Sequence, residues 1–225
     1  MKTYIGIILA FILSTNCIQA QSNAFKTYKA FNGITFEYAL LLPENFDSNK
    51  SYKTIVSFAG VEPKDDLSEA TITTLWKNHK RHHTIVIVPK VPIGESDWIS
   101  HPIHHGFNDF LKFIKGQFKV KNKKFHFVGY QGGCVPAQTY ISMLDFPPAS
   151  LTVLSSDNWD HYDDKNYSRL SKLEIPIHLI YHKSNERGIK KGRQVEQVLK
   201  AKGTEVTLKI SEDFIAELES MISKN

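Results

Sequence analysis

Cysteine is scarce in this chain, which holds only Cys17 and Cys134 among 225 residues. So few cysteines exclude a framework of several disulfides. Cys17 lies in an N-terminal segment that we expect to be removed, so the remaining chain would keep Cys134 alone and form no intrachain disulfide. A chain of this length can fill a hydrophobic core without crosslinks, and we expect its stability to come from packing.

Blocks of a single charge are also missing. The 28 Lys and Arg residues and 23 Asp and Glu residues give a formal net charge of +5, and the lysines are scattered along the chain. Nucleic-acid-binding tails typically concentrate their basic residues in one block. We therefore expect no nucleic-acid partner, and we find no motif that calls for a cofactor.

The most apolar run, Tyr4–Leu13, is too short to cross a bilayer of about 30 Å as a helix. Lys2 precedes it, and the polar residues Ser14-Thr15-Asn16 lead from it to Ala20. This order is typical of a secretory signal peptide, so we interpret residues 1–20 as a signal for export to the periplasm or the exterior. A lipid anchor on Cys17 is the alternative, but Asn16 is not the small residue that usually precedes such a cysteine.

The remaining residues 21–225 suit one domain with alternating strands and helices. Asn32-Gly33 is a hairpin signal between the strand-like runs 24–31 and 34–41. Short apolar runs then alternate with helix-length patterns, which predicts an α/β fold with a mostly parallel sheet, helices on both faces and no large lid. We expect strands at 54–60, 84–89, 124–128, 151–155, 177–181 and 206–210, and helices at 68–83, 107–114, 135–144, 190–201 and 214–222.

The segment Lys124–Cys134 passes from an apolar strand into a glycine-rich turn, Gly129-Tyr130-Gln131-Gly132-Gly133, and then into a helical pattern. This frame is similar to the G-x-S-x-G nucleophile elbow, in which glycines let the backbone bend sharply between a strand and a helix. The chain here resembles the α/β-hydrolase family, in particular its small secreted esterases and polyhydroxybutyrate-depolymerase-like members. The resemblance places Gln131 at the nucleophile position, and a carboxamide cannot be activated as a nucleophile. The alternative is that residues 129–133 form an ordinary strand-to-helix loop.

The same resemblance extends over most of the chain. The segment Tyr38–Phe46 resembles the second strand of these esterases, and Val56–Gly60 resembles the strand whose loop supplies an oxyanion-hole amide. It implies backbone donors at Gly60 and Gly132, an acid at Glu186 and a base at Glu212. No histidine follows His182 in the sequence, so the triad would lack its imidazole as well as its serine.

We therefore expect an exported, non-catalytic ligand- or partner-binding protein, with a small ester or carbohydrate as a candidate ligand. The alternative is an active carboxylic-ester hydrolase with a relocated centre. It would use Ser155 or Cys134 with one of the histidines His101, His105, His161 and His182. For Cys134, a buried core position is the other interpretation, since the thiol would lie in the first helical turn after the elbow.

Several side chains are candidates for lining a cleft at the strand ends. They are Trp98, His101, His105, Asp157, Trp159 and His182. His101 and His105 have i,i+4 spacing, but a zinc site would need a third ligand from elsewhere in the chain, such as His182 or Asp157, so we expect a polar rim of histidines and no metal. The basic run His79–His83 is interpreted as a solvated helix end. We also expect the Gln131 carboxamide to fill the vacated nucleophile space at the cleft floor as a plug near Gly60 and either Glu186 or Glu212.

Overall fold

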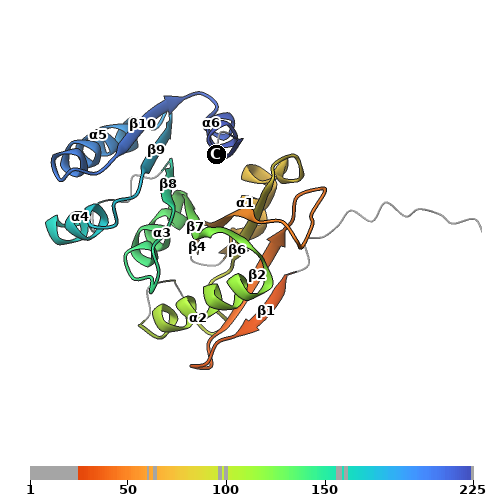
Figure 1. The fold of residues 1–225 in the computed structure, drawn as a ribbon. Coiled ribbons are helices and arrows are strands. Elements are labelled where there is room, and N and C mark those ends of the chain that lie inside the picture. Colours follow the sequence, from red (N-terminus) through yellow and green to blue (C-terminus); the bar gives the residue numbers. More distant parts are fainter. Residues whose placement is uncertain are drawn as a thin grey trace, which may run out of the picture.

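The structure of the chain is a computed structural model (Figure 1). It describes residues 25–59, 61–62, 65–95, 98, 101–155, 159 and 162–223, and the side chains of 61–62, 65–66 and 101 are not described. The interpretation of residues 1–20 as a signal peptide, Cys17 included, falls outside this range.

The centre of the molecule is an eight-stranded sheet with the order β1-β2-β6-β3-β7-β8-β9-β10. β1 pairs with β2, and β2 with β6, in antiparallel fashion, while the other neighbouring strands are parallel. The predicted mostly parallel sheet with an antiparallel N-terminal hairpin is confirmed. The strands are β1 (Lys26–Lys29), β2 (Thr35–Leu41), β3 (Tyr52–Phe58), β6 (Thr84–Pro89), β7 (Val120–Tyr130), β8 (Ser150–Leu154), β9 (Ile177–His182) and β10 (Val206–Ser211), and a separate pair is formed by β4 (Val61–Glu62) and β5 (Asp65–Asp66).

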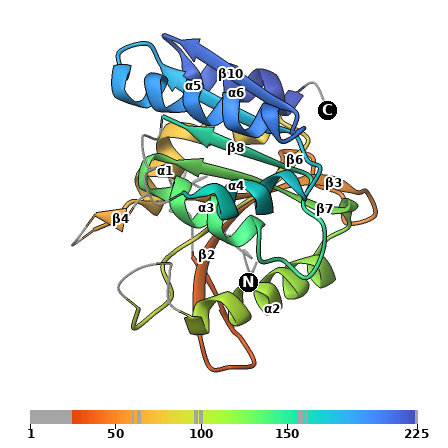
Figure 2. The ribbon, with the colours of Figure 1, turned by 90° about the vertical axis from the view of Figure 1, so that its left-hand side faces the viewer.

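Helices cover both faces of the sheet (Figures 1 and 2). They are α1 (Ser68–Leu75), α2 (His101–Gln117), α3 (Cys134–Ile141), α4 (Asp164–Ser171), α5 (Glu186–Ala201) and α6 (Phe214–Ser223), with short 3-10 turns at η1 (His79–Arg81) and η2 (Gln131–Gly133). Apolar side chains of α2, α3, α4 and α5 join one core cluster, and those of α1 and α6 join a second. We call these the α2–α5 face and the α1/α6 face.

Two helices differ from the sequence expectation. The single helix expected over 68–83 is wrong, because α1 ends at Leu75 and η1 forms a separate turn. The intervening Trp76 is buried, and its indole N–H donates to Ser57 Oγ at 2.9 Å, which fixes the chain against β3. We did not expect α4, although Asp163 caps it by accepting a hydrogen bond from the Asn166 N–H at 2.8 Å.

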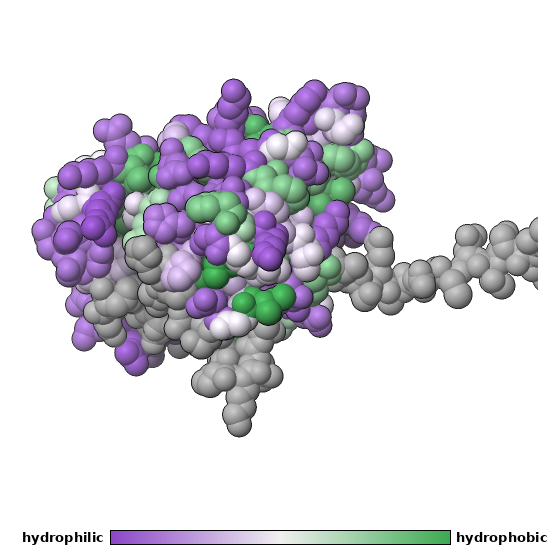
Figure 3. All heavy atoms as spheres, turned by 90° about the horizontal axis from the view of Figure 1, so that it is seen from below, coloured by the Kyte–Doolittle hydropathy of each residue, from purple (hydrophilic) through white to green (hydrophobic). Residues whose placement is uncertain are grey.

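The surface seen in Figure 3 is mostly hydrophilic, and its apolar residues are scattered rather than gathered into one large patch. Among the described residues, the large apolar side chains that remain exposed are Phe31, Ile93, Met143 and Ile210. They come from separate parts of the chain. No helix within the described ranges is both long and apolar enough to cross a membrane.

Candidate functional site

The predicted elbow is a sharp turn between a central strand and a helix. β7 ends at Tyr130, η2 follows over Gln131–Gly133, and α3 begins at Cys134. Gln131 has a φ of +50°, in the left-handed region that a residue with a side chain rarely adopts. Such a conformation costs about 1–2 kcal/mol, so the surrounding structure must hold it in place.

Two glycines explain how the turn is held. A Cβ atom on Gly129 would lie 2.5 Å from the Cα of Cys134, and one on Gly133 would lie 2.1 Å from the carbonyl oxygen of Phe58. Both contacts are with backbone atoms, which cannot move aside as a flexible side chain could. The start of α3 therefore lies directly against the ends of β7 and β3, and only glycine fits at these two positions.

The side chain of Gln131 is exposed, and its Nε2 donates to the Tyr130 hydroxyl at 3.2 Å. The expectation that it plugs the floor of a cleft is therefore wrong, because the carboxamide points to the surface and is held by the neighbouring residue. Tyr130 stacks on Phe214 at a ring separation of 5.8 Å. Burial raises the pKa of Tyr130, so its hydroxyl stays neutral and able to hydrogen-bond.

The ends of four parallel strands lie next to one another at this edge. Tyr130 is in register with Leu154, Leu154 with Ile180, and His182 with Ser211. The residues that follow these ends therefore lie along one carboxyl edge, which is where sites form in open α/β sheets. They include Gln131, Ser155, Lys183 and Glu212.

The two carboxylates assigned to the acid and base positions are both on the surface. Glu186 is the first residue of α5, directly after Asn185, whose side chain caps the helix by accepting from the Gly188 N–H at 2.8 Å. Glu212 follows β10 and forms an ion pair with Lys183. Both side chains of this pair are largely exposed, at 59% and 73%, and Glu212 places a carboxylate where the resemblance implies a base.

Ser155 and His182 form the second noteworthy pair at this edge. Ser155 follows β8 with a φ of +53°, and its Oγ accepts a hydrogen bond from the backbone N–H of His182 at 3.3 Å. The His182 ring instead pairs through Nδ1 with Ser184 Oγ at 2.6 Å and meets Phe214 edge-on. The imidazole therefore lies at the predicted cleft but is directed toward Ser184 and not toward Ser155.

The structure places the other candidates away from this edge or inside the core. Trp98 is 3% exposed and Trp159 is fully buried, so the prediction that their faces line a cleft is wrong. Trp98 packs against Phe58 and accepts a hydrogen bond from the Tyr140 hydroxyl at its carbonyl, whereas Trp159 packs against tyrosine rings. Both indoles are wide apolar groups that the layer beneath the loops uses as packing.

Cys134 is fully buried, with its Sγ 3.7 Å from the carbonyl oxygen of Leu154. This position agrees with the core interpretation and leaves the thiol inaccessible to a substrate. His105 is exposed on α2, whose next residue, Gly106, lies against the β1–β2 hairpin. Gly60, Asp157, His161 and the side chain of His101 lie outside the described residues, and the described part of the chain holds no cluster of three metal-ligating side chains.

Several solved structures with a similar fold are esterases. A thermostable esterase superposes with a TM-score of 0.61 at 17% identity, with 84% of this chain covering 54% of that one. A ferulic acid esterase superposes with a TM-score of 0.64 at 11% identity, and the match covers 89% of this chain and 97% of that one. A butyrate-bound esterase from Thermogutta terrifontis superposes with a TM-score of 0.64 at 11% identity, and the match covers 91% of this chain and 94% of that one. The chain has the α/β-hydrolase fold.

These likenesses concern the fold alone, because the identities are low. This chain spans about half the length of the thermostable esterase but nearly all of the other two. No protein-family model matches the sequence, and no curated protein matches it. Tyr130, Lys183, Ser184 and Phe214 were not among the site residues expected from the sequence. Their position directly beside predicted strand ends was the signal that could have found them.

Proposed function

We propose that this chain is an exported α/β-hydrolase-fold protein that does not hydrolyse esters at its elbow and instead binds a ligand or partner at the carboxyl edge of the sheet. The observation that carries the proposal is Gln131, which occupies the strained elbow position with φ +50° and an exposed carboxamide. The elbow backbone is kept, together with its glycines, but the side chain at its apex cannot attack a carbonyl.

The catalytic base of the triad is replaced as well as its nucleophile. Glu212 stands where the resemblance places the histidine, and it is paired with Lys183. Removing one member of a working serine triad lowers the rate by roughly 10⁴- to 10⁶-fold, and the parts act as a unit. Two replaced members therefore leave no more than background hydrolysis.

Binding at the same edge is supported by the mixture of groups there. Tyr130, His182 and Phe214 bring half-buried rings together, and Gln131 and Ser184 add hydrogen-bonding groups at the surface. Rings beside a few polar groups are typical of sites for sugars and for small esters. A carbohydrate or an unhydrolysed ester is therefore the ligand class that we propose.

The test is an esterase assay on p-nitrophenyl acetate and butyrate. We expect the unaltered protein and Gln131→Ser to show no turnover above buffer, because one restored side chain lacks its base. Gln194→Ser, an exposed glutamine on α5, is the matched control. Robust hydrolysis by the unaltered chain would overturn the proposal. The double variant Gln131→Ser/Glu212→His asks whether a fluorophosphonate label appears once both side chains are replaced.

An active hydrolase with a relocated centre is the second candidate, favoured by the left-handed conformation of Ser155 next to His182. A fluorophosphonate probe read by intact mass separates the two candidates without assuming a substrate. Stoichiometric labelling that Ser155→Ala and His182→Ala both abolish would favour the relocated centre. Absence of labelling in the folded protein favours the binding function.

A further inference from the structure

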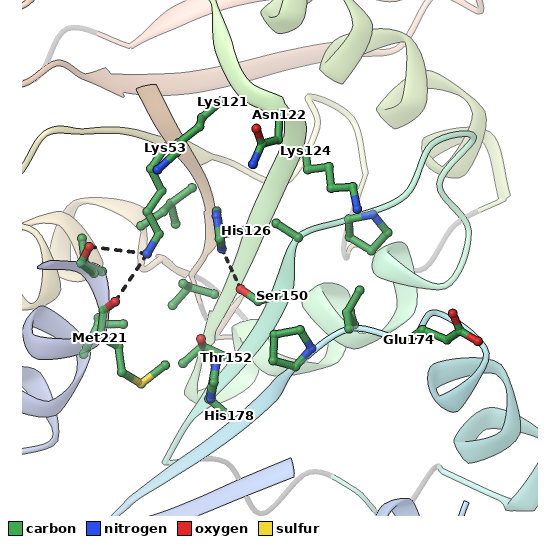
Figure 4. A pocket seen from close by; sticks show the side chains of 18 residues that line it. Lys53, Lys121, Asn122, Lys124, His126, Ser150, Thr152, Glu174, His178 and Met221 are labelled. Carbon is green, nitrogen blue, oxygen red and sulfur yellow. Dashed lines mark hydrogen bonds between the residues drawn. The ribbon is translucent and has the colours of Figure 1, made fainter. Parts of the chain in front are cut away.

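A second site lies at the opposite, amino-terminal edge of the sheet. A pocket of about 470 Å³ opens on the α1/α6 face, beside the last turns of α6 and the first residues of β8 and β9. Figure 4 shows its lining, with His126 of β7 near the centre and Ser150, Thr152 and His178 beside it. At about 3.3 Å per strand residue, His126 lies roughly 13 Å along β7 from the elbow.

The floor of the pocket combines polar and apolar groups. His126 Nδ1 is 2.8 Å from Ser150 Oγ, and His178 Nδ1 is 2.8 Å from Thr207 Oγ1 on β10. Desolvation by burial lowers the pKa of both imidazoles, so they are neutral at pH 7; nearby Lys53 adds to the shift of His126, whereas Glu205 opposes that of His178. The apolar part comes from Ile55, Val128, Ile175, Leu218, Met221 and Ile222.

Positive charge gathers at the rim. Lys53, Lys121 and Lys124 all line the pocket, whereas Glu174 is the only acidic residue among the described residues that line it, and its carboxylate points away from the histidines (Figure 4). The Lys53 ammonium group is directed toward the carbonyl oxygens of Met221 and Ile222, at 3.4 and 3.5 Å. The described lining therefore presents a field that attracts anions.

A distortion of β7 brings the lysines to one side. Asn122 and Lys123 have φ values of +54° and +56°, and the pairing of β3 with β7 shifts register between Tyr52 and Thr54. In a regular strand, residues 121 and 122 would point to opposite faces. Here Lys121, Asn122 and Lys124 all line the same pocket, because the irregular backbone breaks the alternation.

A smaller pocket of about 330 Å³ adjoins the first and shares Lys53, Lys121 and Ile222 with it. Its other wall carries Arg81, His82 and His83, the basic run that the sequence suggested to be a solvated helix end. The Nε2 atom of His82 is buried there without a hydrogen-bond partner. The two pockets thus meet at a basic boundary, with an apolar wall on one side of it.

We propose that this amino-edge site binds a small amphiphilic anion. The negatively charged head, a carboxylate or a phosphate monoester, lies at the boundary between Lys121 and Arg81. Its short apolar body enters the larger pocket against Leu218 and Met221. The volume of the larger pocket, about 470 Å³, is in the range of pockets that hold small molecules.

Isothermal titration of the purified protein with hexanoate, hexyl phosphate and hexan-1-ol tests this proposal. We expect the anions to bind and the alcohol, which has the same chain without the charge, to bind at least tenfold more weakly. Lys121→Glu and Arg81→Glu should each weaken anion binding by about three- to tenfold, since each reverses one charge beside the proposed head position. The tighter of the two anions identifies the head group.

Lys26→Glu is the matched control, because it makes the same charge change on exposed β1 at the far side of the sheet. Retained thermal midpoints show that the variants fold, and shifts of the His126 and His178 imidazole signals in ¹H–¹⁵N spectra locate the ligand. Equal binding of the alcohol, equal losses in the Lys26 variant, or no anion binding at 10 mM would each overturn the proposal. The esterase assays at the elbow do not affect these outcomes.

Discussion

The two faces of the sheet are built differently, although the same strands supply both. Along β7, Phe125 and Phe127 are fully buried in the cluster under α2–α5. Between them His126, and after them Val128, face the α1/α6 side. On β7, the α2–α5 face carries buried rings, whereas the α1/α6 face carries His126 toward the amino end and the apolar Val128 toward the carboxyl end. Residues that fill the closed core on one face of β7 therefore alternate with residues that line the accessible pocket on its other face.

The largest expected effect compares the faces directly. Phe127→Ala should lower the free energy of unfolding by about 3–5 kcal/mol, because it leaves a cavity in a fully buried ring cluster. Thr152→Ala, on the opposite face and lining the pocket, should cost no more than about 1 kcal/mol. Urea denaturation of both variants measures the difference. Similar losses at both positions would mean that the pocket face carries as much packing energy as the closed face.

The next effect concerns the pH dependence of the polar face. Burial lowers the pKa of His126 to about 4, with Lys53, Lys121 and His178 adding to the shift, while Lys124 and Glu174 are the other charged groups around the pocket. The folded state therefore binds fewer protons than the unfolded state between pH 4 and 6.5, and stability falls as the pH falls through this window. The loss amounts to at most about 3 kcal/mol.

Thermal unfolding at pH 7.0 and 4.5 measures this loss, and His126→Gln is the control because glutamine can still hydrogen-bond Ser150 without titrating. We expect the variant to lose less stability on acidification than the unaltered protein. If the unaltered protein and His126→Gln lose the same stability on acidification, other groups cause the acid sensitivity. The titration of His126 would then not distinguish the two faces.

A smaller change in stability is expected at the elbow, on the carboxyl edge of the sheet. Gln131→Gly should stabilise the protein by about 1 kcal/mol, because glycine adopts the left-handed conformation without a side-chain clash. Gln194→Gly, in the regular part of α5, should destabilise it by about the same amount. Shifts of the denaturation midpoint in opposite directions for the two Gln-to-Gly variants would locate stored strain at the elbow. A lower midpoint in both variants would show that Gln131 makes contacts that outweigh the strain.

The smallest expected effect is at the Lys183–Glu212 pair, whose side chains are 59% and 73% exposed. A double-mutant cycle with Lys183→Ala and Glu212→Ala should give a coupling of about 0.5 kcal/mol or less, because solvent screens the charges. A coupling several times larger would indicate that this edge is less hydrated than its exposure indicates.

The sheet and the elbow could be predicted from the sequence because both have local signals. Asn32-Gly33 marked the hairpin, apolar runs marked the buried strands, and Gly129 and Gly133 marked a turn that only glycine fits. The direction of the Gln131 side chain could not be predicted, because it depends on the hydroxyl of Tyr130. The indoles of Trp98 and Trp159 were misplaced for a related reason, since a loop residue can fold back into the core.

The amino-edge pocket could not be predicted from the sequence. His126 and His178 are about fifty residues apart and look like isolated polar interruptions of apolar strands. They meet only through the pairing of β7, β8 and β9. The lysines around residue 121 look like an ordinary charged segment until the irregular backbone at Asn122 and Lys123 directs them to one side.

The buried thiol of Cys134 gives the protein a reporter of its own opening. Because this side chain has no solvent exposure and lies between α3 and the end of β8, a thiol reagent can reach it only when that interface separates. The alkylation rate under native conditions then equals the opening equilibrium constant multiplied by the rate of an exposed thiol. A slow rate that responds to urea as global unfolding does would show that the elbow and the sheet open together. A faster, urea-insensitive rate would show that α3 lifts off by itself.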